Sequence, residues 1–539
     1  VEVFCESGRQ RRGTADFDAP LGGICGNGLD MAADSEHRRS RLSPPAGHTG
    51  IAVGTISDER QPVRNRSRPD PEAGDNTDLV QRRAADPVET HDTRALHALR
   101  QILVGRADHD ARDLTLASIA DAVGAVMQDT YLFHAVVSHD RLRPLVDAAF
   151  KSVEDALAAL DRAKKAFDAM RFLGSVTQGG TPPAPRGYVA RTVLPTSGPD
   201  PNASAYTPES DRKFQATRDS LWKIMNPRWP RSADGKWFWK ADTSSDELDG
   251  HYFLYGLYYD LVAKGDAAEE RNVREHVAAL TDHLIAHNFQ LVDHDGTVTR
   301  WGVYNPEKLN HDSMWADDRS LNSSSILSYL KTAEHITGDA KYAAAAKKLI
   351  TEHGYHINTM MAKSNGGAGA GNQSDDEMAF MLLYNLMRYE TDPKLRMIYG
   401  IALKRRWEVE APELNPFFNF IAASVLQGEK YTDSHRTHDL TLRGAWLEES
   451  IDTLRRFPLD RFDWRHTNSH RKDIVKFAGS NRGHRRDGRV TPIDERFVNH
   501  WNHDPWALDQ GGAGRTLADG AAFLLPYYMG LFHGYIAKP

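Results

Sequence analysis

The sequence predicts a mainly helical protein whose helices pair into hairpins and form an α/α toroid. Beyond Glu209, apolar residues recur at three- and four-residue steps in segment after segment, and short turns separate these segments. Residues 291–305 interrupt them with alternating character around the turn Asp295-Gly296, which predicts a short β hairpin in a loop. A four-helix bundle is too small for this many helices, so a larger array is expected. The candidate helices are residues 251–265, 269–289, 320–338, 340–354, 376–390, 393–410, 415–429, 442–457 and 520–536.

Composition limits the class of protein. The chain has 539 residues, of which 40% are hydrophobic, and its net charge of −7 gives no overall basic field for nucleic acid. It contains no apolar run of about 18 residues, the length that predicts a membrane span. The first residues, beginning with Val1, lack the pattern of a signal peptide. We therefore expect a soluble protein that binds neither nucleic acid nor a membrane.

The distribution of cysteine and tryptophan suggests the domain boundaries. Cys5 and Cys25 are the two cysteines, so disulfides, thiolate metal sites and cysteine nucleophiles are excluded from the rest of the chain. All eleven tryptophans lie between Trp222 and Trp506, and the first ninety residues hold too little apolar matter to form a core. We expect a disordered or non-native segment (1–90), a helical region (91–175), a Gly/Pro-rich linker or extended arm (176–208) and an α/α-toroid catalytic domain (209–539).

Acidic and aromatic side chains are most concentrated between Trp237 and Asp260. Asp246, Glu247 and His251 lie within two helical turns of one another, and Trp239 comes shortly before them. Aromatic rings stack on the apolar faces of sugars, while carboxylates bind hydroxyls or transfer protons. This segment therefore indicates a sugar site.

The same residues have a structural interpretation. Ser244 and Glu247 have the S-x-x-E spacing of a helix capping box, and Ser374 with Glu377 repeats it before a second apolar run. Acids in a first helical turn also suit the positive end of the helix dipole. Either acidic turn alone is more simply explained as a helix cap, but two of them would line one mouth if the fold brings their helix starts together.

Further clusters could face the same mouth. Trp301 follows the predicted hairpin, and Asp317-Asp318-Arg319 precedes a helix, where it could position a sugar or form surface ion pairs. The glycine run 365–371 lacks the ending of a phosphate-binding loop, so we interpret it as a mobile loop over the cleft.

The C-terminal part has an unusual polar and aromatic loop. Its candidate substrate-binding residues are Arg496, His500, Trp501 and Asn502. His500 and His503 are close enough in sequence to share a metal ion, but no metal motif supports this, and we expect neither a metal nor a cofactor. The basic runs 466–472 and 482–486 could meet an acidic polysaccharide, although such runs are more often solvated, mobile loops.

Residues 209–539 resemble the six-hairpin, α/α-toroid carbohydrate-active proteins. The resemblance rests on helix pairs separated by aromatic loops, on the segment 321–350 and on the Trp- and Asp-rich helix starts. It is one of architecture, with no family motif, and it implies a substrate cleft at one end of the toroid. Proteins of this type include glycoside hydrolases, polysaccharide lyases and sugar epimerases.

Three functions follow from these observations. A glycoside hydrolase would draw its acid/base pair from Asp246 or Glu247 and from Asp376 or Glu377, with the carboxyls about 5 Å apart for retention of configuration and about 6.5–9.5 Å apart for inversion. Its sugar platforms would be Trp239, Trp301 and Trp501.

A uronate lyase or epimerase would instead use His251 or His500 as base, Tyr255 as acid, and Arg319 or Arg496 to neutralise the substrate carboxylate. A non-catalytic sugar-binding or scaffold protein would need no carboxylate pair. Hydrolysis of a poly- or oligosaccharide is the favoured hypothesis. Sugar identity, linkage and oligomeric state cannot be derived from the sequence, and a cysteine-poor enzyme of this kind fits a bacterial periplasm or exterior as well as a cytoplasm.

Overall fold

The computed structural model describes residues 143–203, 206–361, 373–459, 464–496, 501, 503–514 and 520–537, and the compact unit considered below begins at residue 159. Helices make up 54% and strands 11% of the described residues, which confirms the mainly helical class. Within these residues every sheet is a two-stranded antiparallel pair, so helix packing rather than a sheet organises the fold. No described helix is long and apolar enough to cross a membrane.

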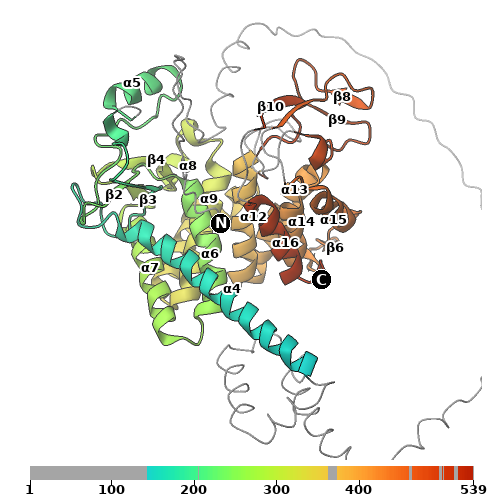
Figure 1. Cartoon of the computed structure of the whole chain (residues 1–539), viewed down its shortest axis with the longest axis horizontal. Coiled ribbons are helices and arrows are strands. Elements are labelled where there is room, and N and C mark those ends of the chain that lie inside the picture. Colours follow the sequence, from blue (N-terminus) through green and yellow to red (C-terminus); the bar gives the residue numbers. More distant parts are fainter. Residues whose placement is uncertain are drawn as a thin grey trace, which may run out of the picture. The chain divides into compact units, whose positions relative to one another are not determined.

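All nine helices expected from the apolar periodicity are present (Figure 1). Their bounds are α6 Ser245–Tyr258, α7 Ala267–Ala286, α9 Arg319–Thr337, α10 Ala340–His353, α12 Gln373–Tyr389, α13 Pro393–Glu410, α14 Pro416–Leu426, α15 Trp446–Arg456 and α16 Ala521–Phe532.

The remaining helices are α4 Arg143–Ser175, α5 Pro208–Thr217, α8 Pro306–Leu309 and α11 Tyr355–Asn358, with short turns η1 Pro201–Ala203, η2 Tyr259–Ala263, η3 Ser313–Trp315, η4 Ala411–Glu413 and η5 Ile493–Glu495.

The helices form an inner and an outer row. Inner helices contact one another in the order α6, α9, α12, α14 and α16, and α6 also contacts α12 directly. The outer helices α7, α10, α13 and α15 pack against this row. The sequence reflects the difference, because α14 is apolar on nearly every side, whereas α10 buries only Tyr342, Ala346 and Leu349. Successive inner and outer helices are the hairpins that the sequence predicts.

Helix α9 packs against α6, α7, α10 and α12 and carries a group of buried serines. Ser323, Ser324, Ser325 and Ser328 are completely buried in it. The Ser324 hydroxyl donates to the carbonyl of Ser320 at 2.8 Å, so its polarity is satisfied within the helix itself.

Short turns explain how adjacent helices reverse direction. Gly338 ends α9 with φ 72°, and Asp339 begins α10 by accepting a hydrogen bond from the Lys341 amide at 2.9 Å. Glycine adopts this left-handed conformation without steric cost, and aspartate satisfies an amide that the helix leaves unpaired. Two residues are therefore enough to close this hairpin.

The strands occur in the connections between helices. The predicted β hairpin around Gly296 is confirmed as β3 and β4. The basic runs 466–472 and 482–486, interpreted as mobile loops, instead contribute residues to paired strands. Residues 466–467 belong to β7, which pairs with the distant β10, and residues 483–485 belong to β9, which pairs with the preceding strand β8. The pairs are β1 Val193–Pro195 with β2 Trp237–Trp239, β3 Gln290–Val292 with β4 Val298–Val303, β5 Lys430–Thr432 with β6 Thr437–Asp439, β7 Trp464–Thr467 with β10 Asp509–Ala513, and β8 Ile474–Lys476 with β9 Gly483–Arg485.

Part of the Gly/Pro-rich segment 176–208 packs against the rest of the described chain as an extended arm. Tyr188 and Val189 are buried, and the Tyr188 hydroxyl accepts a hydrogen bond from the Thr243 amide at 3.1 Å. The described part of the region expected to be helical forms α4, in which Phe167 stacks on Tyr258. Residues 1–90 lie outside the described part of the chain.

A buried ion-pair cluster fixes the chain just before α6. Arg228 lies 3.1 Å from Asp211 and 2.9 Å from Asp242, and all three side chains are buried. Asp242 adopts the left-handed conformation at φ 60°, which is unusual for a residue other than glycine. Its carboxylate also accepts from the Arg300 amide at 2.8 Å, and its own amide donates to Asp293 at 2.7 Å. These contacts hold the turn that leads into α6 against the β3–β4 hairpin.

Replacing Asp242 with Ala should lower the free energy of unfolding by about 3 kcal/mol, because the change leaves buried Arg228 with a single carboxylate partner. Denaturant unfolding would measure the loss. Asp242→Asn, which tolerates the left-handed conformation and keeps a hydrogen-bond acceptor, should lose less, and Asp161→Ala on exposed α4 should change stability far less. An Asp242→Ala variant as stable as the native protein would show that the cluster does not hold this turn.

Candidate functional site

The structure brings the two acidic helix starts together. Helices α6 and α12 pack against each other, and the charges of Asp246 and Asp375 interact across the contact. Asp249, one turn further along α6, interacts with both. The two acidic turns, which are far apart in the sequence, therefore form one acidic cluster.

The start of α9 lies beside the same cluster. Arg406 on α13 donates to the Ser320 hydroxyl at 2.7 Å and faces Asp375 and Asp376. The acids themselves lie in the first turns of α6 and α12, where the positive end of each helix dipole favours negative charge.

Glu247 is a capping residue. It accepts from the Ser244 amide at 2.8 Å and from the Ser244 hydroxyl at 2.6 Å, and its second oxygen lies 3.0 Å from Arg191. The capping box predicted at this position is confirmed. Because both carboxylate oxygens are engaged, Glu247 is a poor candidate for the proton-transferring role considered for it.

The second acidic turn lies at the start of α12. The described part of this helix begins at Gln373, so Asp375 and Asp376 lie in its first turn, where acids suit the helix dipole, and half-buried Glu377 follows them. Residues 371 and 372 lie outside the described residues, and the capping box at Ser374 stays a prediction. Asp375, which was not among the predicted site residues, interacts with Asp246.

Asp246 combines solvent access with crowding by protein. Its side chain is exposed, yet surrounding protein, the charge of Glu247 and the charge of Asp375 together raise its pKa to about 7, against the opposing effect of Arg191. Asp246 is thus accessible and half-protonated near neutral pH.

Asp249 is a buried carboxylic acid on α6 that interacts with Asp246. It is completely buried, accepts a short hydrogen bond from the Tyr329 hydroxyl of α9, and has a pKa raised well above the usual range, chiefly by burial. Its spacing of three residues from Asp246 places both on one face of α6. That spacing is a signal the sequence offered, but burial could not be read from it.

Two further acids complete the cluster. Glu410 ends α13, Glu413 ends η4, and both are buried. Glu413 interacts with Glu410 and with Asp376. Sequence reasoning missed this pair, because the two glutamates follow no motif and their proximity to α12 depends on helix packing.

The predicted tryptophan platforms are mostly in the core. Trp239 is fully buried, with its ring edge against His294, because its strand β2 pairs under the extended arm. Trp501 is buried and donates to the carbonyl of Ala522 at 2.5 Å. Trp301 is half-buried, and the Arg300 guanidinium covers it at 3.6 Å from the ring centre. Neither Trp239 nor Trp501 offers an open face to a sugar.

His251 lies on the opposite side of α6 from the acidic cluster. Its ring nitrogen is 2.5 Å from the Tyr255 hydroxyl, which in turn is 2.7 Å from His276 on α7. Burial alone lowers the pKa of His251 to about 4, so it is neutral at pH 7. Five residues along a helix rotate a side chain by about 140°, which explains why His251 faces α7 when Asp246 faces α12.

The remaining predicted site residues lie in different surroundings. Asp317 is exposed, Asp318 occupies the cap position of α9, and Arg319 donates to the Leu309 carbonyl at 2.5 Å. Arg496 is buried beside Glu413. His500 and Asn502 lie outside the described residues. Within the described residues, no group of three or more His, Cys, Asp or Glu side chains is placed to hold a metal ion.

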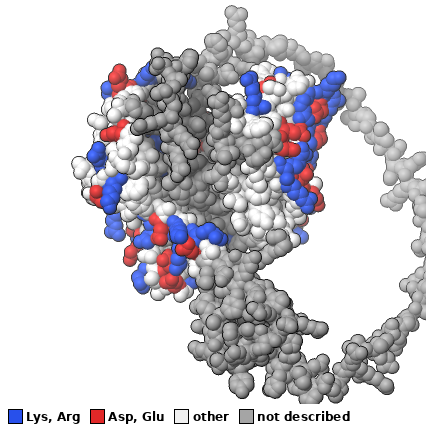
Figure 2. Space-filling view, viewed as in Figure 1, with Lys and Arg blue, Asp and Glu red and all other residues white. Residues whose placement is uncertain are grey.

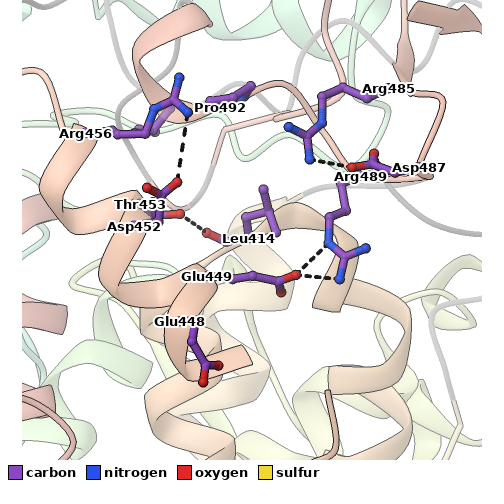
Figure 3. Close-up of a pocket in the computed structure, with 11 residues that line it drawn as sticks. Leu414, Glu448, Glu449, Asp452, Thr453, Arg456, Arg485, Asp487, Arg489 and Pro492 are labelled. Atoms are coloured by element: carbon purple, nitrogen blue, oxygen red, sulfur yellow. Dashed lines mark hydrogen bonds and ion pairs between the residues drawn. The ribbon is translucent and has the colours of Figure 1, made fainter. Parts of the chain in front are cut away.

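A cavity of about 380 Å³ lies elsewhere, between α15 and the β8–β9 region (Figure 3). Its charged side chains neutralise one another, since Arg489 binds Glu449 at 2.7 Å and Arg485 binds Asp487 at 2.6 Å. Figure 2 shows the same mixture of acidic and basic side chains along the right flank of the molecule. None of the predicted site residues lines this cavity.

Comparison with known proteins gives no relative: no family model, no curated protein and no solved structure matches this chain. The candidate site therefore rests on the geometry described above.

Glu247→Ala should lower the free energy of unfolding by about 1 kcal/mol, as loss of a helix cap does. Glu247→Gln keeps an oxygen for Ser244 and should lose less. Urea unfolding of both variants would measure this. If Glu247→Gln left stability unchanged but removed a catalytic activity that Asp246→Asn spared, the capping role would be insufficient and Glu247 would become the proton donor.

Proposed function

We propose that this protein is a glycoside hydrolase that cleaves a poly- or oligosaccharide with carboxylates from the starts of α6 and α12. The observation that carries the proposal is the pairing of Asp246, whose pKa is raised to about 7, with the acidic first turn of α12. Glycoside hydrolysis needs one protonated carboxyl and one ionised carboxylate at the same bond, and unlike environments supply that difference.

Asp246 is the proposed general acid. It is accessible to solvent, and crowding together with two neighbouring charges favours its protonated form. The proposed base or nucleophile comes from Asp375 and Asp376. Both carboxylates interact with the charge of Arg406.

The helix rows support the α/α toroid as the scaffold of this enzyme. Four successive hairpins place α6, α9, α12 and α14 inside and α7, α10, α13 and α15 outside. Closure of this array into a ring is part of the proposal. The acids then lie at the end of the array where the inner helices start, which is where the resemblance to six-hairpin proteins puts a cleft.

Elimination or epimerisation is the less favoured chemistry. His251 and Tyr255, which would exchange protons with a uronate, are buried and bonded toward His276 on α7. A non-catalytic sugar-binding role would not require a carboxyl with a raised pKa beside other acids.

Incubation of the full-length protein with neutral and uronate-containing polysaccharides should release reducing ends without the ultraviolet absorbance of unsaturated uronates. Asp246→Asn should lower kcat by about 10²- to 10⁴-fold, the usual contribution of a general acid. Asp375→Asn and Asp376→Asn, compared in parallel, identify the partner carboxylate. Asp452→Asn, an exposed carboxyl of the α15 cavity, is the matched control and should retain full activity.

Absorbance rising with the reducing ends would assign elimination instead. Loss of activity in Asp452→Asn with retention in Asp246→Asn would move the site to the cavity. Binding of a polysaccharide without any turnover would support the non-catalytic alternative.

The pH dependence should follow Asp246. A general acid acts only when protonated, so kcat/KM should fall as pH rises through about 7, the pKa of Asp246 in the free protein. Initial rates between pH 5 and about 9 would show this alkaline limb. A profile that stays flat through pH 8, measured on a stable enzyme, would contradict the assignment of Asp246.

A further inference from the structure

Two histidines share the hydroxyl of a buried tyrosine between α6 and α7. The Tyr255 hydroxyl lies 2.5 Å from His251 Nδ1 and 2.7 Å from His276 Nε2. Tyr255 is completely buried, His251 is 4% exposed and His276 is half-buried. The mechanism proposed above uses none of these three residues.

A single hydroxyl hydrogen serves both contacts of Tyr255. A phenol has one hydrogen, so it donates to one imidazole and accepts an N–H hydrogen from the other. The chain is therefore complete when both rings are neutral, and it can also take up one extra proton. If both rings were protonated, each would donate to Tyr255, and the hydroxyl hydrogen would lose its acceptor.

Helix α4, which runs across α6 and α7, covers His276 (Figure 1). Phe167 lies edge-on to the His276 ring at 6.1 Å between ring centres, and it stacks on Tyr258 of α6 at 4.4 Å. A Cβ atom at Gly174 would lie only 3.1 Å from His276 Cε1, so α4 approaches the ring this closely because residue 174 has no side chain. Residues 159–175 of α4 therefore shield His276 from water.

The charged groups of α4 and α7 that lie near the chain leave a protonated ring without a counter-ion. Arg171 of α4 acts on His276 with a charge of the same sign as an imidazolium. Asp168 of α4 is exposed and lies 3.4 Å from Arg171. Glu269 of α7 accepts a hydrogen bond from the Tyr258 hydroxyl at 2.8 Å.

The groups of α6 that face the chain are uncharged. They are His251 and Tyr252, whose ring meets Tyr255 edge-on at 5.5 Å. Burial lowers the pKa of His251 to about 4, and burial followed by the charges of His251 and Arg171 lowers the pKa of His276 to about 3. Both rings are therefore neutral at pH 7.

We propose that the chain His251–Tyr255–His276 is an acid-sensitive joint, in which protonation of His276 separates residues 159–175 of α4 from α6 and α7. A buried imidazolium without a counter-ion is costly, and the cost falls when water reaches the ring. Because α4 covers His276, solvation of the ring requires α4 to move away. The joint is independent of the proposed glycoside hydrolase function.

Hydrogen exchange of the full-length protein tests the joint without a substrate. If His276 titrates at its ordinary value of 6.5 once α4 has opened, the opening equilibrium should rise about 25-fold between about pH 7 and pH 5. Exchange of the amides of residues 159–175, corrected for the intrinsic effect of pH, should increase by at least that factor. Unchanged protection of these amides would overturn the proposal, and so would a simultaneous loss of protection in α12, because the opening would then be global.

Replacement of His276 with Gln assigns the effect to the imidazole. Glutamine keeps a hydrogen-bonding group for Tyr255 but does not titrate, so the response of α4 to acid should be about 25-fold smaller. His311→Gln, at an exposed histidine, is the matched control and should keep the full response. A full response in His276→Gln would show that other groups open α4 and would overturn the proposal.

Thermal unfolding supplies a second test with a defined sign. A histidine whose folded pKa is lowered binds fewer protons in the native than in the unfolded state. The stability that it contributes is complete above about pH 6.5 and is lost as the pH falls toward about 3. The Tm of the native protein relative to His276→Gln should therefore fall between about pH 7 and pH 5. A difference that stays constant with pH would contradict the joint.

If His276→Gln does not fold, Phe167→Ala allows the same decision. This change removes the ring that covers His276, so water reaches the imidazole before α4 opens and its pKa moves toward the ordinary value. The increase in α4 exchange between about pH 7 and pH 5 should then largely disappear. An undiminished increase would count against the joint.

Discussion

The buried ion pairs of Arg228 fix the part of the chain on which the site depends. Asp242 pairs with Arg228 in a left-handed conformation and also binds the amide of Arg300 in β4. Three residues later α6 begins, capped by Ser244 and Glu247, and Asp246 lies in its first turn. The position of the proposed acid is thus set by a salt bridge that is remote from any substrate.

The proposed site also depends on how α6, α9 and α12 pack together. The acids of α6 and α12 interact because these two helices pack against each other and against α9. Like charges at close range and restricted solvation then raise the pKa of Asp246. Proton affinity at the site is therefore a consequence of how closely three helices pack, and the helix dipoles at their starts partly offset the repulsion.

The sequence was informative where local physics decides the outcome. Apolar periodicity located nine helices, and the Ser244–Glu247 spacing located a real cap. Prediction from the sequence failed where contacts between distant parts of the chain determine which side chains are buried. Trp239 and His251 are residue types typical of a sugar site. Both are buried, however, and their burial depends on which face of β2 or α6 meets the core.

Glu410 and Glu413 are the opposite case: two acids that sequence reasoning did not single out and that the structure buries. Nothing in their local sequence distinguishes them from surface acids, and only the turn at η4 and the indole of Trp506 make them a buried pair. A buried acid is visible in the sequence only when a motif requires it, and no motif covers this pair.

The serine face of α9 offers a route by which such an enzyme could change its working pH without changing an acid. Ser324 and Ser325 are completely buried, so a larger side chain at either position would have to displace a neighbouring helix, and a displacement of α6 or α12 would separate Asp246 from Asp375. Asp246 and Asp375 would then repel each other less, and the proton affinity of Asp246 would fall. In enzymes built on such a scaffold, the pH optimum would then vary with the size of buried side chains that do not contact the substrate.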